Sequence, residues 1–256
     1  MQDNSDKKRM LYDLKACLAF ITILPMGKDP GYSPMGMIRF FPVAGLIIGL
    51  LLALVDRAAT LVWPLPVAAV VDMVFLVAVT GAFHLDGLGD TADGLFSHRG
   101  RERALEIMKD SRTGMMGLVA VVLGLVVKLA GIWAVKSTAS PAQVAGILVV
   151  VPSLSRAGMI FGVRFLDYGR SGPGTGKDLF NRPAGIGDFI FCPVPLAIAL
   201  VLGYKGLVIL AGFGLGVALI LRFYKKTMGG ITGDMLGAMT EVMEAGLFLA
   251  AGTLLV

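Results

Sequence analysis

The chain has 256 residues, of which 56% are hydrophobic and only 16% are charged. A soluble domain carries roughly 25% charged residues, and a chain of this size cannot hide so much apolar surface in its own core. The composition therefore excludes an ordinary soluble protein and predicts a membrane-embedded one. The formal net charge of +5 indicates loops beside anionic lipid headgroups and no nucleic-acid partner, because the basic residues flank apolar runs.

The apolar runs predict an all-α, polytopic membrane helix bundle, since a spanning helix needs about 20 mostly apolar residues. Residues 11–24 are too short to span and are expected to form an interfacial or re-entrant helix. About seven transmembrane helices are predicted, at residues 37–61, 65–83, 115–135, 142–163, 189–202, 207–223 and 235–256. The fifth contains Pro193 and Pro195, which predict a kink or a partial span. We expect one integral membrane domain over residues 1–256.

Lysine and arginine residues are distributed unevenly between the two sides of this predicted bundle. The N-terminal segment and the loops after the second, fourth and sixth spans carry 18 of them, whereas the alternate loops carry only Arg57, Lys136 and Lys205. The positive-inside rule then places the N-terminus and those three loops in the cytoplasm.

An acidic motif begins at the cytoplasmic end of the second predicted span, where residues 84–94 read HLDGLGDTADG. Asp86, Asp90 and Asp93 are spaced i, i+4, i+7 and share one face of a helix. Their mutual repulsion grows near a low-dielectric boundary, and a divalent cation would relieve it. Oxygen ligands of this kind suit Mg²⁺ or Mn²⁺, which also bridge substrate phosphates. The alternative is a solvated acidic turn without chemistry.

Further polar residues lie within the acidic motif or in the loop after it. His84 is a candidate base or ligand, although a lone histidine is more often held in place at a helix end. Lys109 and Arg112, with Asp110 between them, lie in the next loop. Cations beside an acidic cluster suit phosphate oxygens or a departing phosphate. Taken alone, the basic residues of this loop would only anchor the third predicted span at the membrane surface.

Charged residues inside predicted spans are costly and usually functional. Asp72 and Lys128 lie in mid-span, and Arg156 lies nearer the cytoplasmic half. Asp72 is a candidate partner of Lys128 or Arg156, or a substrate ligand. Because of its position, Arg156 is the better candidate for contact with a polyanionic ligand.

The last polar block, residues 228–244, places carboxylates at the start of the seventh predicted span. Asp234, Glu241 and Glu244 are in helical phase there. They predict a polar cavity or a metal site, or else structural ion pairs with Arg156 or Lys128. Residues 169–177, GRSGPGTGK, lack the glycine and hydroxyl positions of a phosphate-binding Walker loop, and we expect a mobile cytoplasmic loop that closes over substrate.

Four blocks of this sequence resemble a known enzyme family. HLDGLGDTADGLF at 84–96, EIMKDSRTGMMG at 106–117, SR at 155–156 and GGITGDMLGA at 229–238 are similar to signature blocks of the cobalamin synthase (adenosylcobinamide-GDP ribazoletransferase) family. The blocks extend over nearly the whole chain in the family's order, and the first is long and specific. The loop 167–182 resembles the family less clearly.

The resemblance implies a membrane enzyme that joins α-ribazole or its phosphate to GDP-activated adenosylcobinamide and releases GMP, with Mg²⁺ as cofactor. It implies the inner membrane of a bacterial or archaeal cell, with the active site facing the cytoplasm. The expected catalytic residues are His84, Asp86, Asp90 and Asp93. The three aspartates are also the expected metal ligands. The expected substrate-binding residues are Lys109, Asp110, Arg112, Arg156, Asp234 and Glu241.

Two other functions stay open at the level of the sequence. Residues 90–94 resemble the start of the CDP-alcohol phosphotransferase motif, but its later arginine and aspartates are absent. A cation transporter would use Asp72, Asp234 and Glu241 as an ion path, but transporters often contain repeats and this sequence has none. The sequence leaves a homo-oligomer possible and does not define its size.

Overall fold

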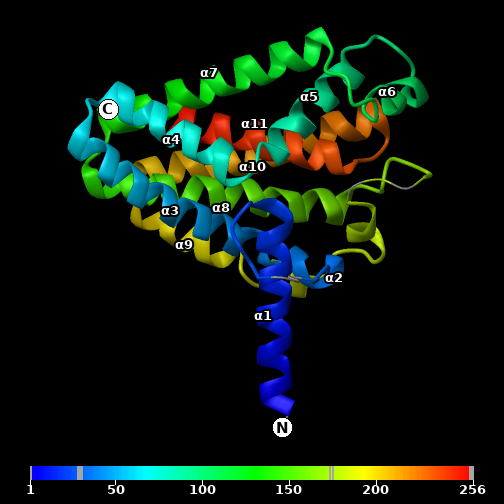
Figure 1. The fold of residues 1–256 in the computed structure, drawn as a ribbon, viewed down its shortest axis with the longest axis horizontal. Helices are drawn as coiled ribbons and strands as arrows, with labels where there is room; N and C mark the ends of the chain where they lie inside the picture. Colours follow the sequence, from blue (N-terminus) through cyan, green and yellow to red (C-terminus); the bar gives the residue numbers. More distant parts are fainter. Residues whose placement is uncertain (1, 28–30, 173, 175, 254–256) are drawn as a thin grey trace.

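The protein is described by a computed structural model that covers residues 2–27, 31–172, 174 and 176–253. Within these residues every regular element is a helix and no strand occurs, which confirms the all-α class. The order along the chain is α1 (Gln2–Ile21), α2 (Pro34–Met37), η1 (Ile38–Phe40), α3 (Phe41–Val62), α4 (Leu65–Val79), α5 (Phe83–Leu95), α6 (Arg101–Ile107), α7 (Met115–Thr138), α8 (Pro141–Phe165), η2 (Lys177–Phe180), η3 (Ile186–Phe189), α9 (Pro193–Val201), α10 (Tyr204–Met228) and α11 (Gly233–Ala251). The long helices form one elongated bundle (Figure 1).

Four of the described helical stretches are long and apolar enough to cross a membrane. They are Pro34–Val62, Met115–Thr138, Pro141–Phe165 and Tyr204–Met228, and α4 with α5 would make a fifth if this bent pair counts as one span. The protein is therefore an integral membrane protein, but the predicted number of about seven spans is not confirmed.

The second predicted span, 65–83, ends early because the chain turns sharply after α4. Gly81 and Ala82 both have left-handed backbone angles, with φ of 58° and 59°, and such residues end a right-handed helix. The axes of α4 and α5 differ by 85°. The turn therefore directs α5, with its three aspartates, away from the direction of α4.

The fifth predicted span is the partial one that its prolines predict, whereas the seventh differs from expectation. Within 189–202, α9 is an apolar helix of only 9 residues, because Pro193 and Pro195 fit only its first turn. In place of 235–256, α11 has 19 residues that begin at Gly233, and it carries Asp234, Glu241 and Glu244, too many charges for a simple span. Residues 254–256 lie outside the described part of the chain.

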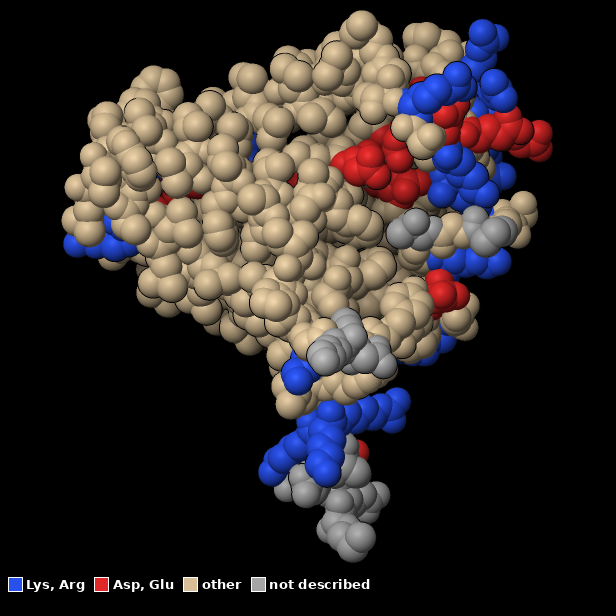
Figure 2. Space-filling view, viewed as in Figure 1, with Lys and Arg blue, Asp and Glu red and all other residues tan. Residues whose placement is uncertain are grey.

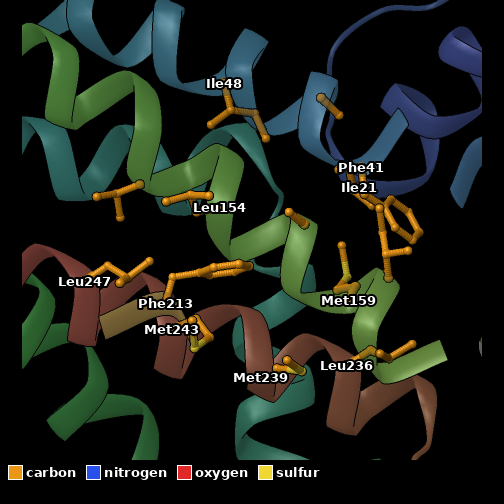
Figure 3. Packing of buried hydrophobic residues seen from close by; sticks show 14 of the residues in the cluster. Ile21, Phe41, Ile48, Leu154, Met159, Phe213, Leu236, Met239, Met243 and Leu247 are labelled. Atoms are coloured by element: carbon orange, nitrogen blue, oxygen red, sulfur yellow. The ribbon is translucent and has the colours of Figure 1, made fainter. Parts of the chain in front are cut away.

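The core follows α8, which packs between α3 on one side and α11 on the other (Figure 3). Leu154 and Met159 of α8 lie among side chains of α3, α10 and α11 in this core. Small residues let the α3 and α8 backbones approach, since a Cβ on Gly45 would lie 2.4 Å from the carbonyl oxygen of Pro152. This close packing holds α8 and α11 in place and so fixes the position of the side chains at the N-terminus of α11.

Helix α1 projects from the side of the bundle at a steep angle to the long helices (Figure 1). It begins nine residues before the predicted 11–24 segment, and its exposed side chains include Met10, Leu11 and Tyr12. Lysine and arginine residues gather on α1 and at the end of the bundle that carries α6 (Figure 2). If the long helices cross a bilayer, α1 has the orientation of an interfacial helix, as the sequence predicts.

Candidate functional site

Four carboxylates form what we call the acid face: Asp86, Asp90 and Asp93 of α5, and Asp234 at the start of α11. They are exposed or partly exposed and form a red patch beside the basic end of the molecule (Figure 2). The two helices touch closely here, because a Cβ on Gly87 would lie 2.6 Å from the carbonyl oxygen of Asp234. The pKa of Asp90 is raised to about 7, first by burial and then by the neighbouring carboxylates. The face thus holds excess negative charge.

Asp93 joins the acid face to the N-terminus of α7. Its carboxylate accepts hydrogen bonds from the backbone N–H groups of Gly114, at 2.6 Å, and Gly117, at 2.7 Å. Unpaired N–H groups at a helix N-terminus favour a negative charge. A Cβ on Gly114 would lie 2.4 Å from an Asp93 oxygen, so glycine is required for this contact. The contact fixes the position of α5 relative to α7.

One cation beside the acid face was not predicted from the sequence. Arg170 donates to Asp234 at 2.7 Å and is close enough to lower the pKa of Asp90. Lys109, which was predicted, is exposed, and its Nζ would be 3.8 Å from a Cβ on Gly172 in the same loop as Arg170. The signal for Arg170 was its place at the head of the glycine-rich segment 169–177, which the sequence predicted to be a mobile loop over substrate without singling out Arg170.

Asp110 and Arg112 form a pair at the surface. Arg112 donates to Asp110 at 2.6 Å, and its side chain is 87% exposed. Hydrogen bonds from Arg112 hold the pKa of Asp110 down at about 2. The two charges neutralise each other, and their predicted contact with substrate stays a prediction.

Arg156 and Glu241 lie in the bundle interior and not on the acid face. With Lys128 and Glu244 they form what we call the buried ion network. Lys128 Nζ donates to Glu241 at 2.6 Å and to Glu244 at 2.9 Å, and Arg156 pairs with Glu244. Structural ion pairs, one of the two alternatives for Glu241 and Glu244, are therefore present, and substrate binding by Arg156 and Glu241 stays a prediction.

Asp72 has a different partner from those the sequence suggested. It accepts a hydrogen bond from Lys136 at 2.9 Å, and Lys136 also pairs with Asp56 of α3. Neither Lys128 nor Arg156 reaches it, because those two bind the glutamates of α11. This second ion pair joins α3, α4 and α7 near the end of the bundle opposite α6.

His84 is buried at the start of α5 and faces away from solvent, with 1% of its surface exposed. It lines a cavity of about 20 Å³ together with Met159, Gly176 and Leu236. Neither ring nitrogen has a hydrogen-bond partner among the residues that the structure describes. The structure therefore separates His84 from the exposed acid face, and its predicted catalytic role remains untested.

A divalent cation fits the chemistry of the acid face. Among the described residues, no group of three or more His, Cys, Asp or Glu side chains forms a ready-made metal site. Mg²⁺, however, is often held by one or two carboxylates together with water and substrate phosphates. Asp86 and Asp90 are suited to this arrangement, and Asp93 keeps lone pairs beyond its two backbone bonds. The three-ligand set predicted from the sequence remains a prediction.

Comparison with known proteins identifies the family. The family model described as cobalamin-5-phosphate synthase matches residues 13–252. The chain belongs to the cobalamin-5-phosphate synthase family. The resemblance noted in the sequence blocks is thereby confirmed, and the acid face, the basic loops and α11 all lie inside the matched region.

Curated relatives agree with this assignment. A protein of Roseiflexus sp. (strain RS-1), named adenosylcobinamide-GDP ribazoletransferase, is 41% identical over 89% of this chain and 84% of its own length. Proteins of the same name from Clostridium acetobutylicum and Herpetosiphon aurantiacus are 32% and 36% identical, over 89% and 92% of this chain and 90% and 94% of their own lengths. No solved structure matches the chain significantly.

Proposed function

We propose that this protein is an adenosylcobinamide-GDP ribazoletransferase. A ribose hydroxyl of α-ribazole, or of its phosphate, attacks the cobinamide-linked phosphorus of the GDP-activated substrate. The new P–O bond forms, the bond to the GMP oxygen breaks, GMP leaves, and the hydroxyl proton passes to solvent. The observation that carries the proposal is the acid face, whose Asp86, Asp90 and Asp93 lie on the long first block of the family resemblance, in a chain whose relatives bear this name.

The residues of the acid face suit this chemistry. Mg²⁺ bound by Asp86 and Asp90 would neutralise charge on the diphosphate and on the departing GMP. Asp93 holds α5 against the N-terminus of α7, and the rigid α8–α11 core supports Asp234. Lys109 supplies a cation for a phosphate oxygen. These residues act by positioning and by electrostatic stabilisation, which dominate phosphoryl transfer.

The test is an assay in liposomes with GDP-activated cobinamide, α-ribazole and Mg²⁺. We expect GMP and joined product to appear in equal amounts, and both to stop when EDTA removes the metal. Full turnover in EDTA would exclude the metal from the reaction. Turnover of a CDP-activated lipid, without turnover of the GDP-activated substrate, would favour the CDP-alcohol phosphotransferase alternative.

We also propose that the acid face lies on the cytoplasmic side of the cell membrane, the inner membrane where there are two. The gathering of lysine and arginine residues at that end of the bundle supports this orientation (Figure 2). In a chain with Cys17 and Cys192 replaced by serine, an Arg99→Cys variant should resist an impermeant thiol reagent added to intact cells. Ser137→Cys should react. Labelling of Arg99→Cys from outside would reverse the orientation.

A further inference from the structure

Two of the three cations that the sequence suggests for substrate binding are paired elsewhere. Arg156 is used by Glu244 inside the bundle, and Arg112 is exposed and paired with Asp110. Arg170 instead lies against Asp234, and 6% of its side chain is exposed. A guanidinium held beside an excess of carboxylates, at the head of a glycine-rich loop, needs a functional explanation.

The backbone around Arg170 is fixed before the glycine-rich loop begins. Gly169 N–H donates to Ile231 at 2.8 Å, and Ile231 N–H donates to Asp167 at 2.9 Å, so this segment pairs with the residues just before α11. Arg101 donates to the carbonyl oxygen of Gly169 at 2.9 Å. The guanidinium of Arg170 is therefore placed by the same elements that place Asp234, and it is preorganised for a ligand at the acid face.

Two buried donors at this point lack acceptors. Arg170 uses Nη2 for Asp234, while its Nε has no hydrogen-bond partner in the described part of the chain. The oxygen of Tyr168 lies close enough to accept from the Arg170 guanidinium, but its O–H finds no acceptor among the described residues. The two groups lie side by side, because a Cβ on Gly174 would be 2.4 Å from Tyr168 Oη and 3.4 Å from Arg170 Nη1. Leaving buried donors unpaired is costly, so this corner is built for a ligand that supplies acceptor oxygens.

We propose that Arg170 and Tyr168 bind the diphosphate of the GDP-activated substrate, an inference that rests on the proposed function. A phosphate offers several acceptor oxygens, and the fork of a guanidinium matches two of them. The four carboxylates of the acid face outnumber Arg170 and Lys109 by two charges. A diphosphate brings further negative charge, so we expect it to bind at this corner only together with a divalent cation, which offsets part of the excess.

The first test measures binding directly, with GDP as the probe. Wild-type protein in lipid nanodiscs should bind GDP in equilibrium dialysis with Mg²⁺ and bind it poorly in EDTA. Arg170→Lys keeps the charge but loses Nε and the fork, and Tyr168→Phe removes one hydroxyl. Each should weaken Mg²⁺-dependent GDP binding about tenfold or more, the usual worth of a hydrogen bond to a charged group. Arg182→Lys, whose arginine pairs with Asp188 elsewhere, is the matched control and should bind normally.

The second test separates substrate binding from a structural role. Both variants should raise the KM for the GDP-activated substrate and leave the KM for α-ribazole unchanged. A folding defect would instead lower the amount of active enzyme and leave both KM values unchanged. If wild-type protein turns over but both variants bind GDP normally, the assignment of Arg170 and Tyr168 is wrong and the proposed function stands. If GDP binding depends on Arg170 but no joined product forms, the proposed function fails and the diphosphate site stands.

Discussion

The acid face and the buried ion network contain the same kinds of side chain but differ in charge balance. In the network, Lys128 and Arg156 face Glu241 and Glu244, so two positive charges meet two negative ones inside the bundle. On the acid face, at the end of the bundle, four carboxylates share one ion pair among the described residues, that of Asp234 with Arg170. Unbalanced charge persists only where water or a ligand can compensate it.

The comparison separates groups that hold the fold from groups that bind substrate. The network joins α7, α8 and α11 through two cations and two carboxylates that pair with one another, and such pairing is what a low-dielectric interior requires. The acid face leaves oxygen atoms free and raises the pKa of Asp90. Perturbed carboxylates of this kind are typical of functional sites. We therefore expect the two regions to respond differently to the same isosteric change.

The largest effect should follow Glu244→Gln. This change keeps the shape of the side chain but leaves Arg156 buried without a carboxylate, and breaking such a pair costs about 3–5 kcal/mol. Thermal unfolding in detergent should shift to lower temperature, while the folded fraction keeps its specific activity. Glu106→Gln, which breaks the exposed pair with Arg103, should change stability by less than about 1 kcal/mol. A stable but inactive Glu244→Gln enzyme would place the network in the chemistry.

Asp90→Asn should behave in the opposite way. Turnover should fall on the order of a hundredfold, and stability should stay the same or rise, because one of four repelling charges is removed. Asp93→Asn alone should also lower turnover. The double variant should lose less turnover than the product of the two single losses, since the contributions of residues in one site are not additive. Glu102→Gln on α6 is the control. Near-normal turnover of both single variants would make the acid face a solvated turn.

Gly87→Ala tests whether the geometry between α5 and α11 matters. The new methyl group would meet the carbonyl oxygen of Asp234 at 2.6 Å, so the helices must separate, at a cost of about 1–3 kcal/mol. Activity and stability should both fall, because Asp234 moves with α11. The control is Gly246→Ala on α11, where a new methyl group would lie in open space, and it should be neutral or slightly stabilising. Equal behaviour of the two variants would contradict the close approach.

The smallest effect should come from Lys109→Ala. Because this lysine is exposed, losing its contact with a phosphate oxygen should raise the KM for the GDP-activated substrate by about tenfold at most. Extra Mg²⁺ should not restore it, since the metal binds carboxylates elsewhere in the site. Lys226→Ala, at the same end of the bundle on α10, should leave the KM unchanged. Rescue by Mg²⁺ would assign Lys109 to the surroundings of the metal.

By itself, the sequence determined the features that depend on local spacing. Hydropathy identified a membrane protein, and the i, i+4, i+7 interval placed Asp86, Asp90 and Asp93 on one side of α5, because the period of a helix is set by its own backbone. The glycines beside these aspartates fitted either a helix or a loop. The structure decides for a helix that packs closely on α11.

Only the tertiary structure decided which charges meet. Asp234 pairs with Arg170 and Lys128 pairs with Glu241, partners 64 and 113 residues apart in the chain. Intervals along one helix carry no information about such contacts. Gly81 and Ala82 likewise turn α5 away from α4 by 85°, at the end of the run 65–83 that hydropathy predicted as a span. Hydropathy depends on side-chain composition, whereas the turn and the ion pairs depend on how the helices pack against one another.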